Sequence, residues 1–179
     1  MEEQTIDSKQ IYAGRRVKLR LDRVMLHGGR ETTREVVEHP DCVAIVALDA
    51  EDNVILVRQF RYAVAKELLE IPAGGVEPGE EPLNSALREL AEESGYTAGR
   101  IERLGGFYSS PGYCTEFLHL FLATELKPGP SQAQEDEILE VVPIPLKQVH
   151  RLIKSGEIRD AKSIAGLLAL SLHRGNSKA

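Results

Sequence analysis

The sequence predicts an α+β or mixed-sheet protein. Residues 15–60 contain short segments in which apolar residues alternate with polar ones or form buried runs, which is typical of strands. A later segment, residues 82–94, has a helical period and residues that favour helix ends. Strands and helices then follow one another without the strict strand–helix–strand rhythm of a parallel sheet.

The first half of the chain predicts four strands. Residues 15–26 alternate between apolar and charged side chains, residues 27–30 form a turn, and residues 32–38 return as a second strand of a hairpin. Residues 42–48 are an uninterrupted apolar run, as expected of a buried strand. After a polar turn, residues 54–60 predict another strand.

The middle of the chain predicts a shaped loop and then a helix. Residues 71–79 contain two prolines and three glycines, which favour a loop. The helix begins at Pro82, a residue suited to a first turn, and Gly95 is suited to the position just past its end.

The last part of the chain predicts further strands, a polar loop at residues 127–137 and two helices. The expected strands are residues 101–108, 117–123 and 139–142, and the expected helices are residues 147–155 and 161–173.

Length and charge restrict the function. The 179 residues are enough for one core domain, and the net charge of −6 argues against a nucleic-acid partner, although a phosphate substrate stays possible if metal ions supply positive charge. The apolar runs are too short to span a membrane, and the polar residues 1–4 do not resemble a signal peptide. Cys42 and Cys114 lack disulfide or zinc spacing, so a reduced cytoplasmic setting is expected.

Three carboxylates crowd one face of the predicted helix. Glu89, Glu92 and Glu93 fall within about 100° of arc, away from the apolar arc that contains Ala86 and Leu90. Like charges at this spacing destabilise a helix, and a hard cation such as Mg²⁺, which prefers oxygen ligands, relieves that cost. Taken alone, such a run is more often a solvated surface.

The surrounding residues favour the metal site. From Gly74 to Tyr96 the chain matches Gly-x5-Glu-x7-Arg-Glu-hydrophobic-x-Glu-Glu-x-Gly, and this segment resembles the Nudix box. Tyr96 stands where the family usually has an aliphatic residue. The resemblance implies the Nudix fold, a mixed sheet between helices, over residues 40–179, preceded by an N-terminal β-hairpin extension over residues 1–39.

The resemblance also assigns roles within the box. It implies that Glu89 and Glu93 bind Mg²⁺, or Mn²⁺ in its place, with the Ala73 carbonyl completing the site. Glu92 would be a further ligand or would lie directly behind the ligands. Arg88, one turn before Glu92, would orient a box glutamate, and Glu80 would hold the loop.

Beyond the box, the chain is similar to the ADP-ribose pyrophosphatase group. The similar segments are residues 70–75, residues 108–113, which place Pro111 sixteen residues past Gly95, and residues 161–166. The resemblance implies a substrate site that includes Glu70, Pro111 and Arg61. Arg58 is a further candidate, because guanidinium groups suit diphosphates, although an exposed strand end explains both arginines equally simply.

The expected reaction is metal-dependent hydrolysis of ADP-ribose to AMP and ribose 5-phosphate. Metal ions would neutralise the diphosphate and activate a water for in-line attack. The general base has to come from outside the metal-bound box, and the acidic loop of residues 134–137 offers candidates. The resemblance implies Glu137 as the base, with Glu135 as the second candidate; a solvated acidic loop is the simpler alternative.

The N-terminal extension is expected to need a partner surface, since two strands alone are marginal in water. The resemblance implies a homodimer in which one subunit helps to hold the adenine of the other, with Tyr12 as a possible stacking residue. Two other functions remain open: hydrolysis of another nucleoside diphosphate sugar such as GDP-mannose, and a ligand-binding regulator that has lost catalysis.

Overall fold

The computed structural model describes residues 2–129 and 139–176, and the chain divides into two compact units. The first unit consists of Met1–Asp41 and Tyr108–Phe117, and the second consists of Cys42–Phe107 and Leu118–Ala179. The predicted extension, residues 1–39, lies within the first unit. A segment far away in the sequence, Tyr108–Phe117, joins it there.

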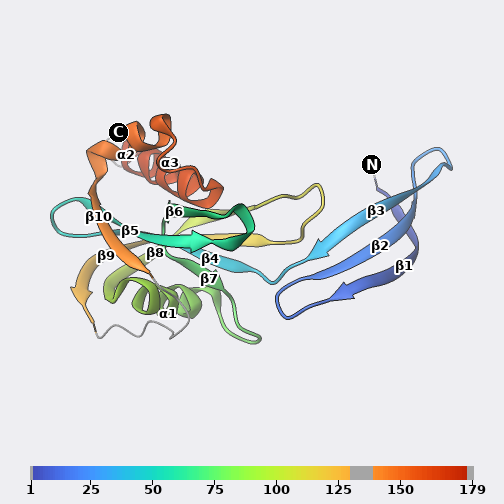
Figure 1. Cartoon of the computed structure of the whole chain (residues 1–179), viewed down its shortest axis with the longest axis horizontal. Coiled ribbons are helices and arrows are strands. Elements are labelled where there is room, and N and C mark those ends of the chain that lie inside the picture. Colours follow the sequence, from blue (N-terminus) through green and yellow to red (C-terminus); the bar gives the residue numbers. More distant parts are fainter. Residues whose placement is uncertain (1, 130–138, 177–179) are drawn as a thin grey trace. The chain divides into compact units, whose positions relative to one another are not determined.

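The first unit contains a three-stranded antiparallel sheet in the order β1-β2-β3 (Figure 1). The strands are β1 (Gln4–Ala13), β2 (Lys18–Met25) and β3 (Glu31–Glu38). The predicted hairpin is present as β2 and β3, but β1 was not predicted. All ten residues of β1 are exposed, so its sequence lacks the alternation that marks a half-buried strand.

The segment Tyr108–Phe117 lies beside β3 within the first unit. The amide of Val37 donates to the carbonyl of Tyr113 at 2.7 Å, and the amide of Thr115 donates to the carbonyl of Val37 at 3.0 Å. The rings of Tyr108 and Phe117 meet edge to face, with centroids 5.0 Å apart. Backbone hydrogen bonds therefore tie this segment to the extension.

The second unit is built on a seven-stranded sheet whose main path runs β10-β5-β4-β9-β8, with β6 paired to β5 and β7 paired to β4. β4 and β9 are parallel, whereas β4 pairs antiparallel with β5 and β7, so the predicted mixed sheet is confirmed. The strands are β4 (Cys42–Leu48), β5 (Asn53–Arg61), β6 (Lys66–Glu70), β7 (Ala73–Gly75), β8 (Tyr96–Tyr108), β9 (Phe117–Pro128) and β10 (Glu140–Pro145).

Helices cover both faces of this sheet (Figure 1). α1 (Pro82–Ser94) lies on one face, and α2 (Leu146–Ser155) and α3 (Ala161–Asn176) lie on the other. A short 3₁₀ turn, Tyr62–Val64, connects β5 to β6. All three predicted helices are therefore confirmed, with α3 extending three residues further than expected.

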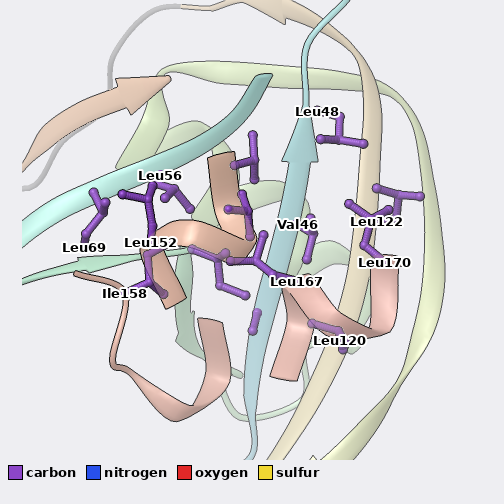
Figure 2. Packing of buried hydrophobic residues seen from close by; sticks show 14 of the residues in the cluster. Val46, Leu48, Leu56, Leu69, Leu120, Leu122, Leu152, Ile158, Leu167 and Leu170 are labelled. Atoms are coloured by element: carbon purple, nitrogen blue, oxygen red, sulfur yellow. The ribbon is translucent and has the colours of Figure 1, made fainter. Parts of the chain in front are cut away.

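β4 is the centre of two cores, because its side chains point alternately to the two faces of the sheet. Ala44, Val46 and Leu48 belong to the larger cluster with α2 and α3, which Figure 2 shows around Val46. Val43, Ile45 and Ala47 belong to the smaller cluster, which Ala86 and Leu90 of α1 complete. These six residues of β4 are all buried, which explains the uninterrupted apolar run in the sequence.

Two short strands correct the sequence prediction. Residues 71–79 were expected to form only a loop, but β7 pairs with β4, placing Ala73 opposite Ala44. β6, which pairs with β5, was not predicted at all. Three-residue strands rich in glycine carry no periodic signal, so only the pairing with β4 reveals β7. Among the described residues, no helix has both the length and the apolar character needed to cross a membrane.

Candidate functional site

α1 is the element that positions the acidic residues. Pro82 occupies its first turn, and Gly95 ends it in a left-handed conformation (φ 69°) whose amide donates to the carbonyl of Ala91. Ala86 and Leu90 anchor the helix in the core, but Leu83 and Leu87, from the predicted apolar arc, are 44% and 37% exposed. The buried stripe is therefore narrower than the helical wheel predicts.

Arg88 gathers the carboxylates of the box around one guanidinium. Its Nη1 atom donates to Glu89 at 2.7 Å and to Glu92 at 3.2 Å, so the contact expected one turn apart is present. Its Nε and Nη2 atoms donate to Glu80 at 3.1 and 2.9 Å, and Nη2 also reaches the carbonyl of Gly75 at 3.1 Å. Arg88 thus joins the loop before the helix to the acidic face of the helix.

Glu80 holds the loop in the way that the sequence indicates. Besides Arg88, its carboxylate accepts hydrogen bonds from the hydroxyl of Ser85 at 2.8 Å and from the amide of Glu77 at 3.2 Å. The hydrogen bonds from Arg88, followed by those from Ser85 and Glu77, lower the pKa of Glu80 from 4.5 to about 2 against the opposing effect of burial. Glu80 is therefore ionised throughout the physiological range.

Glu89 and Glu93 reach back from α1 to the strand β7. A Cβ atom added to Gly74 would lie 2.0 Å from the Cδ atom of Glu89, so this carboxylate occupies the space that a side chain at position 74 would need. Glu93 is a buried residue, 8% exposed, and its carboxylate accepts a hydrogen bond from the amide of Ala73 at 2.9 Å. β7 and α1 thus form one local surface around Ala73, Gly74, Glu89 and Glu93.

This surface fits a hard divalent cation. Carboxylate oxygens from one helix face and backbone carbonyls of β7 are the donor types that Mg²⁺ prefers. Arg88 compensates part of the negative charge, but its one guanidinium contacts three carboxylates, Glu80, Glu89 and Glu92. A fourth carboxylate, Glu93, accepts a hydrogen bond from the amide of Ala73. The excess negative charge beside a glycine strand is what a cation would neutralise.

Arg61, at the end of β5, belongs to a second charged cluster in the same unit. Its Nε and Nη2 atoms donate to the two oxygens of Glu70 at 2.9 and 2.6 Å, a bidentate pair. The hydrogen bonds that Arg61 donates to Glu70 raise the pKa of Arg61, and Coulomb attraction from Glu93 and Asp160 adds to the effect. The guanidinium therefore lies within the field of a box glutamate.

Lys162 and Asp160 continue this cluster. The ammonium group of Lys162 donates to Glu70 and, at 3.0 Å, to Asp160. Burial opposes ionisation of Glu70, but Arg61 and Lys162 together lower its pKa, as Lys162 and Ser163 do for Asp160. Four alternating charges thus extend from the first turn of α3 to Arg61.

The remaining predicted residues have different surroundings. Arg58 pairs with Glu140 of β10 at 3.1 Å, with its side chain 42% exposed. Tyr12, 57% exposed on β1, and Pro111, exposed in the segment beside β3, both belong to the first unit. The candidate bases Glu135 and Glu137 lie outside the described residues.

Two features of the site were not predicted from the sequence. No signal in the sequence indicates that Gly74 faces Glu89, since the contact depends on how β7 and α1 pack. The participation of Asp160 had a partial signal, because an aspartate directly before a helix is a typical cap. Its carboxylate indeed accepts from the amide of Ser163 at 2.9 Å.

Known proteins resemble this chain over most of its length. A family model described as NUDIX domain matches residues 38–167. An ADP-ribose pyrophosphatase of Bacillus subtilis is 41% identical, covering 96% of this chain and 94% of the relative. A methanol dehydrogenase activator of Bacillus methanolicus is 40% identical with the same coverage, and a GDP-mannose pyrophosphatase of Citrobacter koseri is 36% identical, covering 78% and 77%.

A solved structure shares the fold. The crystal structure of an "ADP compounds hydrolase" superposes with a TM-score of 0.89 at 22% identity, covering 100% of this chain and 98% of that chain. At this identity the match speaks for the architecture alone, and it includes the extension as well as the sheet and its helices.

Proposed function

The chain belongs to the NUDIX domain family, and we propose that it hydrolyses the diphosphate bond of ADP-ribose to give AMP and ribose 5-phosphate. The observation that carries this proposal is the 41% identity to an ADP-ribose pyrophosphatase across 96% of the chain. The box that the reaction requires is intact, which favours a hydrolase over a regulator without catalysis.

The proposed cofactor is Mg²⁺, held by the carboxylates of Glu89, Glu92 and Glu93 with the carbonyl of Ala73. When bound, the metal supplies positive charge to the diphosphate and acidifies the attacking water. The carboxylate of Glu89 beside Gly74 and that of Glu93 beside Ala73, together with the all-oxygen donor set, support the proposal. Mn²⁺ has similar preferences and is the expected substitute.

The protein's own side chains orient the reacting groups. Arg88 holds Glu89 and Glu92 on one side of the helix, so that both carboxylates face the same space. Arg61 is proposed to bind the diphosphate or the terminal ribose. Its pair with Glu70 engages Nε and Nη2, and a guanidinium has five N–H donors, so donors remain to meet an anion.

The proton of the attacking water needs an acceptor outside the metal ligands. Glu137 is the proposed general base and Glu135 the alternative, because both lie in the acidic segment just before β10. Arg58, which pairs with Glu140, is proposed to contribute to substrate binding.

Assembly is proposed to complete the adenine site. The proposed homodimer would bring Tyr12 of one subunit to the base bound by the other, since a tyrosine ring offers a stacking surface. The 57% exposure of Tyr12 and the exposed face of β1 support this proposal. Pro111 is proposed to be a substrate-binding residue, as the resemblance implies.

The test is a substrate panel with metal removal. The purified chain is incubated with ADP-ribose or GDP-mannose, in Mg²⁺ or in EDTA, and released AMP and GMP are quantified. We expect the fastest turnover with ADP-ribose, none in EDTA, and recovery when Mg²⁺ is added in excess. A Glu93→Gln variant, which lacks one proposed ligand, is the inactive control.

Each contrary result has a defined meaning. Faster release of GMP would transfer the assignment to GDP-mannose hydrolysis. Full turnover in EDTA would contradict the metal site. Failure to cleave either substrate with Mg²⁺ would overturn the proposed function.

A further inference from the structure

The charged cluster at the start of α3 contains two residues, Lys162 and Asp160, to which the proposed reaction gives no role. Lys162 is 13% exposed in its side chain and donates to Glu70, which is 1% exposed. A buried carboxylate is costly unless it is paired, and Glu70 has two cationic partners, Arg61 and Lys162. Glu70 is therefore held between the largely buried ammonium group of Lys162 and the guanidinium of Arg61, whose side chain is 41% exposed.

We propose that Lys162 is a positioning residue for Arg61, with Asp160 fixing Lys162 in turn; this inference rests on the proposed function of Arg61 in substrate binding. Lys162 holds the carboxylate of Glu70 in a fixed position. Because Glu70 forms a bidentate pair with Arg61, the guanidinium of Arg61 is held in a fixed position too. A long, partly exposed arginine otherwise loses considerable side-chain entropy when it binds a ligand. Pre-ordering lowers that cost before the substrate arrives.

Asp160 and Lys162 are held in place because they belong to the start of α3. Asp160 accepts from the amide and the hydroxyl of Ser163 at 2.9 and 2.6 Å, which caps the first turn of the helix. The hydroxyl of Ser163 in turn accepts from the buried amide of Ile71 at 2.9 Å. The same turn thus fixes the end of the strand that carries Glu70.

The position of this anchor explains why it acts on the substrate site. Ile71 precedes Pro72 and Ala73, and the amide of Ala73 binds Glu93 of the box. Glu93 also attracts Arg61 electrostatically. The first turn of α3 therefore influences both the position of the Arg61 guanidinium and that of β7, the strand beside the box helix.

The test uses Lys162→Met, which removes the charge and keeps an unbranched apolar side chain. We expect KM for ADP-ribose to rise by about 10-fold, while kcat changes far less, because misplaced binding groups weaken binding before chemistry. Asp160→Asn, which retains a good capping residue, should shift KM in the same direction by less. Lys154→Met, at an exposed lysine in the last turn of α2, is the matched control.

A readout that does not depend on turnover separates this inference from the proposed function. In ¹⁵N NMR, the Nε–H of Arg61, which donates to Glu70, should exchange slowly in the wild type and faster in Lys162→Met. Unchanged exchange would overturn the positioning role, whatever the enzyme hydrolyses. If the wild type cleaves no nucleoside diphosphate while the exchange still responds, only the proposed function fails.

A double-variant cycle tests whether Lys162 acts through Arg61. In an Arg61→Met background, adding Lys162→Met should leave KM unchanged, because the residue it positions is already absent. A full additional rise in KM would contradict the inference and would indicate that Lys162 affects the site by another route. A loss of thermal stability alone, with KM as in the wild type, would likewise reduce Lys162 to a structural residue.

Discussion

At the scale of single residues, the site depends on the missing side chain of Gly74 as much as on charged groups. Gly74 leaves the space into which Glu89 folds, and its neighbour Gly75 meets nothing within 4 Å of an added Cβ atom. The two glycines are adjacent on one short strand, yet only one of them is constrained by the box. They therefore form a matched pair for mutation.

Gly74→Ala should displace the carboxylate of Glu89 and weaken Mg²⁺ binding by about 10-fold or more, as loss of a group that orients a ligand typically does. The stability cost should be small, since the clashing atoms are the end of a flexible side chain. Turnover measured against Mg²⁺ concentration checks this, with partial recovery at high Mg²⁺. Gly75→Ala should behave as the wild type, and equal defects in both variants would refute the explanation.

Glu137 is the other residue on which the reaction is proposed to depend. Glu137→Gln should reduce kcat by about 10²- to 10⁴-fold, as loss of a general base does, with a far smaller change in KM. Glu135→Gln should be only mildly impaired. Steady-state kinetics on the two variants decide: reversed effects would make Glu135 the base, and two active variants would direct attention to Glu92.

At the scale of elements, the loop before α1 and the helix itself form one structure through Glu80 and Arg88. Two hydrogen bonds from Arg88 to Glu80 close the loop, and Ser85 and Glu77 add two more. Ionised groups therefore contribute to holding the loop, beside the packing of Val76 against the smaller core cluster. Its stability should accordingly depend on pH.

The expected dependence follows from the lowered pKa of Glu80, about 2 in the folded protein against an ordinary 4.5. A lowered folded-state pKa stabilises the protein above pH 4.5, and the contribution is lost as the pH falls toward 2. In EDTA, Glu80→Gln should therefore melt below the wild type at pH 7, with the difference shrinking toward pH 3. Thermal melts at several pH values measure this.

The control for that experiment is Glu81→Gln. Glu81 is exposed next to Glu80, and its side chain makes no capping hydrogen bond to α1. Its effect on the melting temperature should be small and nearly independent of pH. A difference for Glu80→Gln that stays constant from pH 7 to pH 3 would show that the ion pair does not hold the loop.

At the scale of the whole molecule, the first unit buries little of its own surface. Its strand β1 is exposed along its entire length and stands at the end of the sheet order. Ile6 and Ile11 on this strand are 40% and 51% exposed. Long exposed edge strands are pairing sites that proteins usually cover, which makes a second copy of the chain the expected cover.

We expect a homodimer at micromolar concentration, with a mass by light scattering twice that of one chain. Ile11→Lys should shift the protein toward monomer if β1 lies in the interface, because burying an unpaired charge is costly. Leu172→Lys, on a 72% exposed leucine of α3, is the control. A stable, fully active wild-type monomer would refute both the dimer and the role of Tyr12 across it.

The sequence by itself determined the family, the helices and most of the strands. Periodicity predicted α1 from Pro82 to Ser94 to the residue, and the buried strand β4 likewise, because a helix stripe and an apolar run are local properties. The box motif could be read without a structure, since its residues lie in one continuous stretch of the chain, from Gly74 to Tyr96. The match to the NUDIX domain family bears out that reading.

Only the tertiary structure decided which distant residues meet. β1, β6 and β7 exist through pairing with other strands, and the segment Tyr108–Phe117 joins β3 through backbone hydrogen bonds that have no pattern of their own. The contact between Lys162 and Glu70 spans 92 residues. Such contacts depend on how elements pack in space, and packing is a property of the assembled chain rather than of any window of its sequence.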